Sequence, residues 1–436
     1  DKRWGYFPSG AVAWIITEEN FMKDYSNIVS YLKLRGSVGK TGSQNLGAYD
    51  WRTLMGSATY NGAAGIVPSS LGNDILQWEE QIQKEVGLDY GFWDDRIRGT
   101  LGYYQKKVDN LLYSDPVPTS SSFSSVYQNI GSLKNRGIEF DVRVDIIKNV
   151  QKDLTWNVDF NIARNRTTLE KLNSSDGYFG GGAYDYFKIE EGGETGRFYG
   201  YKDAGRLFMT NEELVGLKTI DPKTGTLKYY RDDYNYERQG DVYIMDLDGD
   251  GQITADGDRT VIGNANPDFF GGFGSTLYWK GLMLNAVFSY SVGGDRFWDE
   301  EKNSSGDMNV YNTSNRILDS WTVNPGVNAS YPRAMYYGWG SNSIITDRYI
   351  HDASYLRMTA LNLSYRLPKH LYKNSILNAV EFTFQATNLF TWTKYPGMDP
   401  QGNFSTTYSA FYNMGIDYST YPSARTYNFG IKLTLK

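Results

Sequence analysis

Successive segments of this chain alternate apolar and polar residues with a period of two, which constrains the fold more than any other feature of the sequence. The pattern is clearest near the end of the chain, where every second residue is apolar: Tyr427, Phe429, Ile431, Leu433 and Leu435. Segments 154–162, 282–290 and 380–386 carry the same pattern. Because successive side chains of a strand point to opposite faces, these segments predict strands with one apolar and one polar face.

The predicted strands are long, and the connectors between them fall into two classes. We expect strands near residues 10–17, 30–40, 76–90, 96–110, 136–147, 153–165, 271–280, 282–291, 352–366, 377–389 and 425–436. Most have roughly 9 to 15 residues, whereas about 5 or 6 is usual in globular proteins. Short connectors near 91–95, 148–152, 280–282 and 367–376 alternate with long ones near 41–75, 111–135, 166–270, 292–351 and 390–424.

A soluble β-sandwich also alternates, but it does not combine long strands with short turns on one rim and long loops on the other. Those features predict an all-β fold, a transmembrane antiparallel β-barrel of the outer-membrane type. We expect the long connectors to be extracellular, and the short ones and the C-terminus to be periplasmic. The residues expected to face lipid are Phe160, Leu284, Phe384 and Phe429, and those expected to face the lumen are Asn161, Asn285, Gln385 and Lys432.

Aromatic residues make up 16% of the chain and include 36 Tyr, and many lie at predicted strand ends. Examples are Trp78, Phe92, Trp93, Tyr278, Trp279, Phe390 and Trp392. Amphipathic rings prefer the membrane–water boundary, so they predict aromatic girdles, although packing within a core or a hairpin would also explain them. No run of 18 apolar residues occurs and the mean hydropathy is −0.52, so no transmembrane helix is expected.

Several classes of site are disfavoured by composition. The chain has no Cys, which excludes disulfides and thiolate metal sites, and only two His, His351 and His370, lie far apart. The net charge of −6 with no basic block argues against nucleic acid as a partner. No catalytic residue is predicted, and we expect no enzyme activity.

The start of the chain and the strand count indicate part of a larger barrel. Residues 1–4 are followed by no apolar stretch, unlike a signal peptide. About eleven strands is an odd number, whereas single-chain bacterial barrels have even counts. We therefore expect residues 1–436 to be the C-terminal part of a barrel domain, with a signal peptide and any plug domain outside this chain.

Short motifs spread along the chain identify a family. They are Arg3–Ser9, Ala13–Glu19, Leu32–Gly42, Asn129–Glu139, Asp246–Gly251, Ser354–Met358, Asn388–Thr391 and Tyr421–Arg425. Each motif alone is weak evidence for a family, but the motifs occur in the same order as in the family and extend over most of the chain. On these motifs the chain resembles the C-terminal portion of a SusC/RagA-like TonB-dependent outer-membrane transporter of the Bacteroidetes type. It departs from the family in ending on Leu435-Lys436, where the family usually ends in an aromatic residue.

The resemblance implies a 22-stranded barrel occluded by an N-terminal plug. It also implies a lid lipoprotein of the SusD type, energy from TonB through an N-terminal part, and surrounding outer-membrane lipid. The implied function is import of an oligomeric nutrient, either a glycan or a peptide. An iron-chelate transporter of the same class is the first alternative. A secreted, calcium-stabilised β-protein that binds or cleaves glycans is the second.

One motif has a chemistry of its own. Asp246, Asp248 and Asp250 occupy relative positions 1, 3 and 5 of an EF-hand-type calcium loop, Gly251 permits the turn at 6, and the Gln252 carbonyl is at 7. Position 12 holds Gly257 instead of an acid, so Asp258 or Asp256 would complete the site. We expect a structural calcium ion here. The alternative is a solvated turn capped by its own carboxylates.

Other candidate sites are less specific. Glycines 180–182 and the segment 192–196 lack the strand–helix context of a phosphate site and indicate flexible loops. Aromatic side chains of two long connectors could stack on substrate, or pack the loops on each other or on the lid. These substrate-binding candidates are Tyr336, Tyr337, Trp339, Phe404 and Tyr408.

Overall fold

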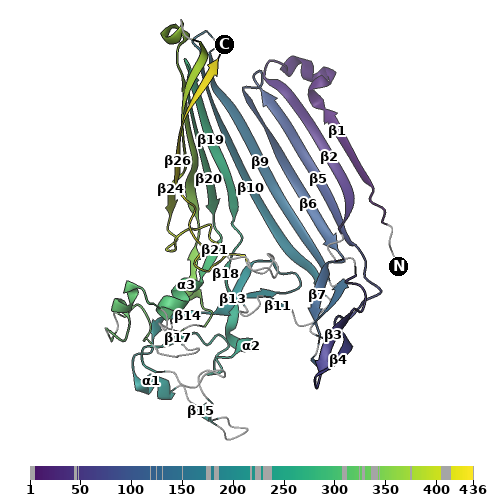
Figure 1. The fold of residues 1–436 in the computed structure, drawn as a ribbon, viewed down its shortest axis with the longest axis vertical. Coiled ribbons are helices and arrows are strands. Elements are labelled where there is room, and N and C mark those ends of the chain that lie inside the picture. The colour runs from purple at the N-terminus through teal and green to yellow at the C-terminus, as the bar shows by residue number, and fades with distance from the viewer. Residues whose placement is uncertain are drawn as a thin grey trace.

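The main element of the fold is a single antiparallel sheet of eleven strands, each paired with the next one along the sheet. The computed structural model describes residues 5–43, 47, 49–117, 119–123, 125–129, 131–149, 151–172, 178–180, 186–216, 219–220, 227–228, 238–306, 312–323, 325–326, 329–334, 342, 344–373, 376–403 and 414–435. Figure 1 shows the sheet as a tall curved wall with the long connectors gathered at one end.

The strands of the sheet match the periodic segments of the sequence closely. They are β1 (Ser9–Ile15), β2 (Val29–Ser43), β5 (Glu79–Phe92), β6 (Ile97–Asp109), β9 (Gly131–Asn149), β10 (Leu154–Leu172), β19 (Phe269–Trp279), β20 (Leu282–Val292), β23 (Tyr355–Arg366), β24 (Leu377–Thr393) and β26 (Thr426–Leu435). β9 and β10 have 19 residues each and extend further toward the loops than expected. The extra residues pair with each other, whereas the pairing of β10 with β19 stops at Ala163.

The connectors alternate between the two ends of the sheet as predicted. The connectors that join β5 to β6, β9 to β10, β19 to β20 and β23 to β24 lie at the end where the described chain finishes, and the long connectors lie at the other end (Figure 1). A further connector at the short-turn end, residues 16–28, contains the 3₁₀ helices η1 (Ile16–Glu18) and η2 (Asn20–Tyr25). The tightest turn needs positive φ at both Lys280 and Gly281, which is the backbone of a two-residue hairpin.

The register sorts side chains onto two chemically different faces. Trp156, Leu277, Leu284, Leu363, Phe384 and Phe429 follow one another across six strands on one face. The opposite face carries Thr276, Asn285, Asn362, Gln385 and Asn428 in the adjacent row. There the Asn285 amide donates to Thr276 Oγ1 at 2.9 Å, and the Asn362 amide donates to Asn285 Oδ1 at 3.0 Å.

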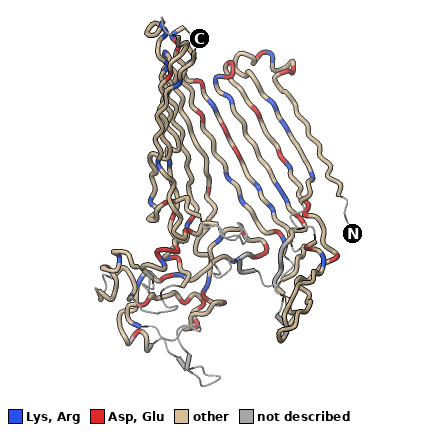
Figure 2. Tube along the Cα trace, in the orientation of Figure 1, with Lys and Arg blue, Asp and Glu red and all other residues tan. Residues whose placement is uncertain are grey.

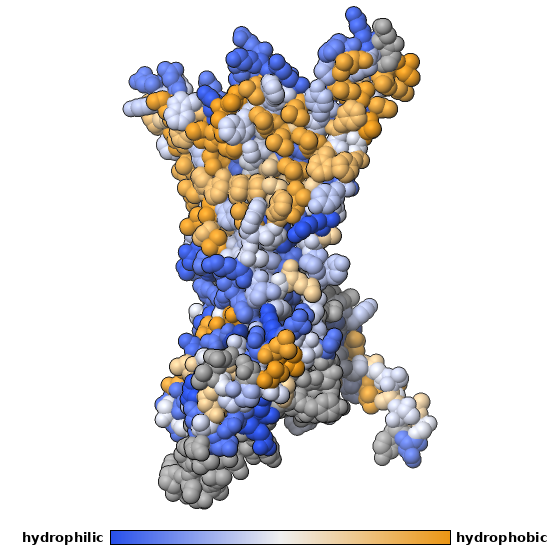
Figure 3. Space-filling view, turned by 90° about the vertical axis from the view of Figure 1, so that its left-hand side faces the viewer, coloured by the Kyte–Doolittle hydropathy of each residue, from blue (hydrophilic) through white to orange (hydrophobic). Residues whose placement is uncertain are grey.

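This division agrees with the facing expected from sequence. Phe160 and Leu284 lie on the apolar face with Phe384 and Phe429, and Asn161 and Lys432 lie on the polar face with Asn285 and Gln385. Figure 3, which views the side of β24 and β26, shows a broad hydrophobic band over the sheet and a hydrophilic zone beside the loops. A single apolar band on one face is the surface that a membrane barrel presents to lipid.

The long connectors form smaller elements of their own. Their strands are β3 (Met55–Tyr60), β4 (Ala63–Pro68), β7 (Leu112–Pro116), β8 (Ser125–Asn129), β11 (Tyr178–Gly180), β12 (Phe187–Ile189), β13 (Arg197–Tyr201), β14 (Asp203–Leu207), β15 (Thr219–Ile220), β16 (Leu227–Lys228), β17 (Val242–Ile244), β18 (Arg259–Asn264), β21 (Asp295–Trp298), β22 (Ile350–Asp352) and β25 (Ile416–Asp417). Their α-helices are α1 (Asn211–Gly216), α2 (Ala255–Asp258) and α3 (Asp299–Glu301). Among the described residues, no helix has the length and hydropathy needed to cross a bilayer.

Candidate functional site

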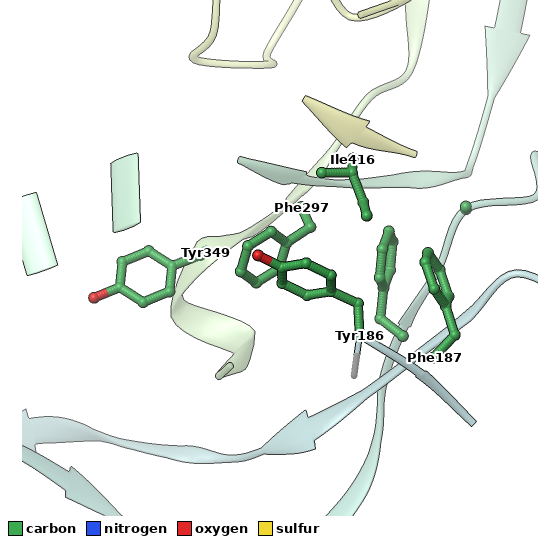
Figure 4. Packing of buried hydrophobic residues seen from close by; sticks show 7 residues of the cluster. Tyr186, Phe187, Phe297, Tyr349 and Ile416 are labelled. Carbon is green, nitrogen blue, oxygen red and sulfur yellow. The ribbon is translucent and has the colours of Figure 1, made fainter. Parts of the chain in front are cut away.

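Three long connectors, 173–268, 293–354 and 394–425, pack into one body with its own apolar core. We call it the loop body. Its first core contains Tyr186, Phe187, Phe198, Ala265, Phe297, Tyr349 and Ile416, so every one of the three connectors contributes to it. The ring centroids of Tyr186 and Phe297 are 4.6 Å apart (Figure 4). Those of Phe187 and Phe198 are 5.0 Å apart. Close ring packing of this kind gives the loop body a defined shape.

Buried ion pairs hold the connectors to one another. Arg333 donates to both carboxylate oxygens of the fully buried Asp241, at 2.6 and 3.2 Å, and the Asn342 amide donates to the same group at 3.0 Å. Arg348 pairs with Asp203 at 2.7 Å. Since an unpaired buried charge is strongly destabilising, these pairs specify which connector segments lie together.

The third connector is attached to the barrel wall through Asp399. Arg357 of β23 donates to its carboxylate at 2.5 Å, and the backbone amides of Gln401 and Ser423 donate to it as well. Burial opposes the charge on Asp399, but the two amides and the Arg357 guanidinium together lower the pKa of Asp399 below its ordinary value. Nearby, burial and the bond to Asp417 raise the pKa of Tyr395, whose hydroxyl donates to Asp417 at 2.8 Å.

The acidic segment predicted to bind calcium lies between β17 and β18, on the second core of the loop body. The carboxylate oxygens of Asp246, Asp248 and Asp250 lie within 4.8 Å of one another. Asp246 accepts hydrogen bonds from the amides of Gly249 and Gly251, at 2.6 and 2.8 Å. The next apolar residue, Ile253, is buried in the second core with Leu207, Phe208 and Ile244. The segment is therefore anchored at one side and exposed at the other.

The remaining predicted ligands are arranged differently. Asp258 is fully buried, and its two oxygens accept the amides of Leu247 and Thr254, each at 2.7 Å. It closes the loop and does not belong to the cluster of three acids. At Gly257, where the usual pattern has an acid, a Cβ atom would meet a carboxylate oxygen of Asp248. Asp256 is exposed.

The predicted substrate-contacting aromatic residues lie outside the described residues. They are Tyr336, Tyr337, Trp339, Phe404 and Tyr408.

The sequence analysis did not identify a polar cavity of about 420 Å³ where the loop body meets the ends of β19, β20 and β23. Ser289, Ser291, Arg296, Tyr355 and Gln401 are among its lining residues. The Arg296 guanidinium donates to the carbonyl of Asp295 at 3.1 Å, and its buried Nε has no partner among the described residues. Burial lowers the pKa of Arg296. Only the fold brings these residues together, and no spacing in the sequence indicates the cavity.

Comparison with known proteins gives consistent matches along the chain. The family model described as "TonB dependent receptor-like, beta-barrel" matches residues 1–389. The TonB-dependent receptor P3 of Formosa agariphila is 33% identical over 99% of the chain, and the TonB-dependent receptor SusC of Bacteroides thetaiotaomicron is 31% identical over 99%. The alignments cover 42% and 40% of those two proteins.

Among solved structures, the RagAB peptide transporter matches 98% of the chain with a TM-score of 0.75 at 26% identity. The "open-open" state of the RagAB peptide importer matches 99% with a TM-score of 0.74 at 27% identity. In both cases the match covers 43% of the other chain. The chain thus spans about two fifths of the length of the proteins it matches.

Proposed function

Because this chain belongs to the TonB-dependent receptor family, whose members are outer-membrane transporters and not enzymes, we propose that it forms part of the barrel of a nutrient importer. The observation that carries the proposal is the polar face of the sheet, with amide and hydroxyl groups bonded across strands, leading to the loop body. A polar wall of this kind suits the passage of a hydrated oligomer.

The proposed cargo is an oligomer, and a peptide is favoured over a glycan by the similarity to the RagAB peptide transporter. The cavity lined by Arg296, Tyr355 and Gln401 offers both hydrogen-bond donors and acceptors, as a chain of amides requires. We place the first contact with cargo there and on the loop aromatics Tyr336, Tyr337, Trp339, Phe404 and Tyr408.

The test compares uptake by two strains. The first carries the gene for the full-length protein, and the second lacks that gene. Fluorescent peptides of five to ten residues should accumulate only in the first strain, and Arg296→Gln should reduce their accumulation. Arg52→Gln, in another long connector, is the matched control and should not. The peptide assignment would be overturned if both strains accumulated peptides equally while uptake of oligosaccharides depended on the gene. Import of an oligomer would be overturned if neither peptide uptake nor oligosaccharide uptake depended on the gene.

Two partners follow from the proposed function. The long connectors would face the extracellular side and dock a lid lipoprotein of the SusD type, and TonB would engage the N-terminal part of the protein. Exposed apolar side chains of the loop body support a docked partner: Leu318 is 64% exposed and Met398 is 65% exposed.

The acidic segment is proposed as a structural calcium site. Asp246, Asp248 and Asp250 would supply carboxylate oxygens, and Gln252 its carbonyl, as a hard cation prefers. Asp258 already accepts two amide hydrogen bonds, so the exposed Asp256 is freer than Asp258 to complete the site. The ion would stabilise the turn between β17 and β18, and with it the second core of the loop body.

A further inference from the structure

The apolar face of the sheet ends differently in its two halves. In five neighbouring strands, β2, β5, β6, β9 and β10, the outward row of apolar residues gives way to basic residues on the side of the loops. These are Lys40, Lys84, Lys107, Lys134, Arg136 and Arg164, which we call the basic belt. In β19, β20, β23 and β24 the same face ends in Phe269, Val292, Leu356 and Trp392. Figure 2 shows Lys and Arg along the loop-side part of the first group of strands.

The register places the basic belt on the lipid-facing side. Lys84 lies opposite Gln105, which lies opposite Arg136, so these residues occupy one row across three strands. The next two rows toward the short turns are apolar except for Arg164. The first contains Val86, Tyr103, Ile138 and Arg164. The second contains Leu34, Leu88, Leu101, Phe140 and Ile162. The basic belt therefore continues the apolar face and cannot line the lumen.

The height of the belt matches the edge of a bilayer. On β9 the outward residues from Ile138 to Ile147 are apolar. At about 3.4 Å per residue and a tilt of about 40°, this run covers roughly 20–25 Å, which is the height of the apolar band of such barrels. Arg136 and Lys134 follow directly, where lipid headgroups begin.

Acidic neighbours compensate only part of the charge. Lys40 pairs with Glu80 at 2.8 Å, and Lys107 and Lys134 share Glu170, each at 3.3 Å. Within the described part of the chain, Lys84, Arg136 and Arg164 have no carboxylate partner, and all three are exposed. Arg136 and Arg164 lie on the paired strands β9 and β10, and Lys84 lies two strands from Arg136 on β5. Together these three cations form a basic surface at the loop-side end of the apolar face, which is complementary to phosphate groups.

We propose that the basic belt binds the phosphate groups of a phosphorylated glycolipid in the membrane leaflet beside the long loops. The assignment to this lipid rests on the proposed function, which puts the loops outside and a glycolipid leaflet around them. The planar guanidinium groups of Arg136 and Arg164 can each donate hydrogen bonds to two phosphate oxygens at once, and Lys84 supplies an ammonium group. Within β19, β20, β23 and β24 the outward residues at the loop-side edge are apolar or aromatic, so these strands offer ring and apolar surfaces to lipid there.

The test compares lipid retention by the full-length protein and two triple variants. The first carries Lys84→Gln, Arg136→Gln and Arg164→Gln. The control carries Lys106→Gln, Arg143→Gln and Lys148→Gln, which removes the same charge from β6 and β9 on the opposite face. Each purified protein is exchanged into nanodiscs that contain bisphosphorylated lipid A, dephosphorylated lipid A or phosphatidylglycerol, and bound lipid is counted by native mass spectrometry.

We expect the belt variant to lose bisphosphorylated lipid A by roughly tenfold or more, since each surface cation contributes measurably to binding of anionic lipid. The control should retain it like the wild type, and dephosphorylated lipid A should be retained poorly by all three proteins. Equal retention by the belt variant and the wild type would overturn the site. Equal retention of phosphatidylglycerol would overturn the assignment to a glycolipid. Neither readout involves cargo, so a failure of the import proposal is seen separately in uptake.

Discussion

At the scale of single residues, parity along a strand decides whether a side chain meets lipid or lumen. Phe384 lies opposite Leu363 and Phe429 on the apolar face, and its ring centroid is 4.9 Å from that of Phe429. Phe384→Arg should therefore destabilise the barrel by about 2–4 kcal/mol, as a cation near mid-membrane does. Gln385→Leu, one residue on, should be tolerated. Urea unfolding in lipid vesicles measures both, and the reverse order would mean that the register is wrong by one residue.

The bond between Asp399 and Arg357 should make the attachment of the third connector sensitive to acid. The pKa of Asp399 is lower in the folded protein than in an unfolded chain, so its contribution is complete above about pH 4 and is lost as pH falls through the folded value. The protection of residues 394–403 from hydrogen exchange, corrected for the intrinsic exchange rate, should therefore decrease as the pH falls below about 4. Asp399→Asn should decrease this protection already at pH 7 and remove its dependence on pH, whereas Asp94→Asn, at the short-turn end, should change nothing. Equal protection in Asp399→Asn and the wild type at pH 7 would contradict the assigned role.

At the scale of an element, the acidic turn between β17 and β18 should depend on its ion. If calcium binds, its removal with a chelator should expose residues 238–264 to protease while the barrel stays resistant, because the sheet is held by its own ladder. Asp246→Asn with Asp250→Asn should abolish bound calcium, measured by elemental analysis. Asp94→Asn with Asp95→Asn, in a short turn, is the control. Unchanged metal content in the first variant, or no metal in the wild type, would contradict the calcium site and mean that the turn is held by its own carboxylates, Asp246 and Asp258.

At the scale of the whole molecule, all short turns lie at one end and the loop body at the other. Residues 1–436 contain no Cys, so this part of the protein adds no background when single substitutions are labelled. With the full-length protein in intact cells, Asn61→Cys and Thr210→Cys, both exposed in long connectors, should react with an impermeant maleimide. Lys369→Cys and Asp94→Cys should react only after lysis. The opposite result would invert the proposed orientation.

The exposed apolar residues of the loop body should carry the interface to the lid. Leu318→Glu with Met398→Glu should reduce co-purification of a lipoprotein partner in mild detergent, because charge would replace apolar contact. Leu371→Glu with Ile376→Glu, 63% and 74% exposed at the opposite end, is the control and should have no effect. A full-length barrel that purifies alone, with its loops protected from protease, would argue against a lid.

The sequence by itself determined the strands, their facing and the alternation of short and long connectors. Those features are local, because both the alternation of apolar and polar residues and the positions of turns depend on residues that are close in the sequence. Strand β20, Leu282–Val292, is an example of such alternation. The same holds for the acidic turn, whose spacing predicted that Asp246, Asp248 and Asp250 lie together.

Only the tertiary structure decided how the connectors pack. Tyr186, Phe297 and Ile416 lie far apart in the sequence and share no period, so nothing local predicts that they form one core. The same is true of Asp241 with Arg333, and of the cavity around Arg296. The hydrogen bonds of Asp258 also depend on the fold: this predicted ligand accepts the backbone amides of Leu247 and Thr254, which its spacing in the sequence does not indicate. Long-range contacts between irregular segments depend on which loops the barrel brings to one rim, and a linear pattern does not contain that information.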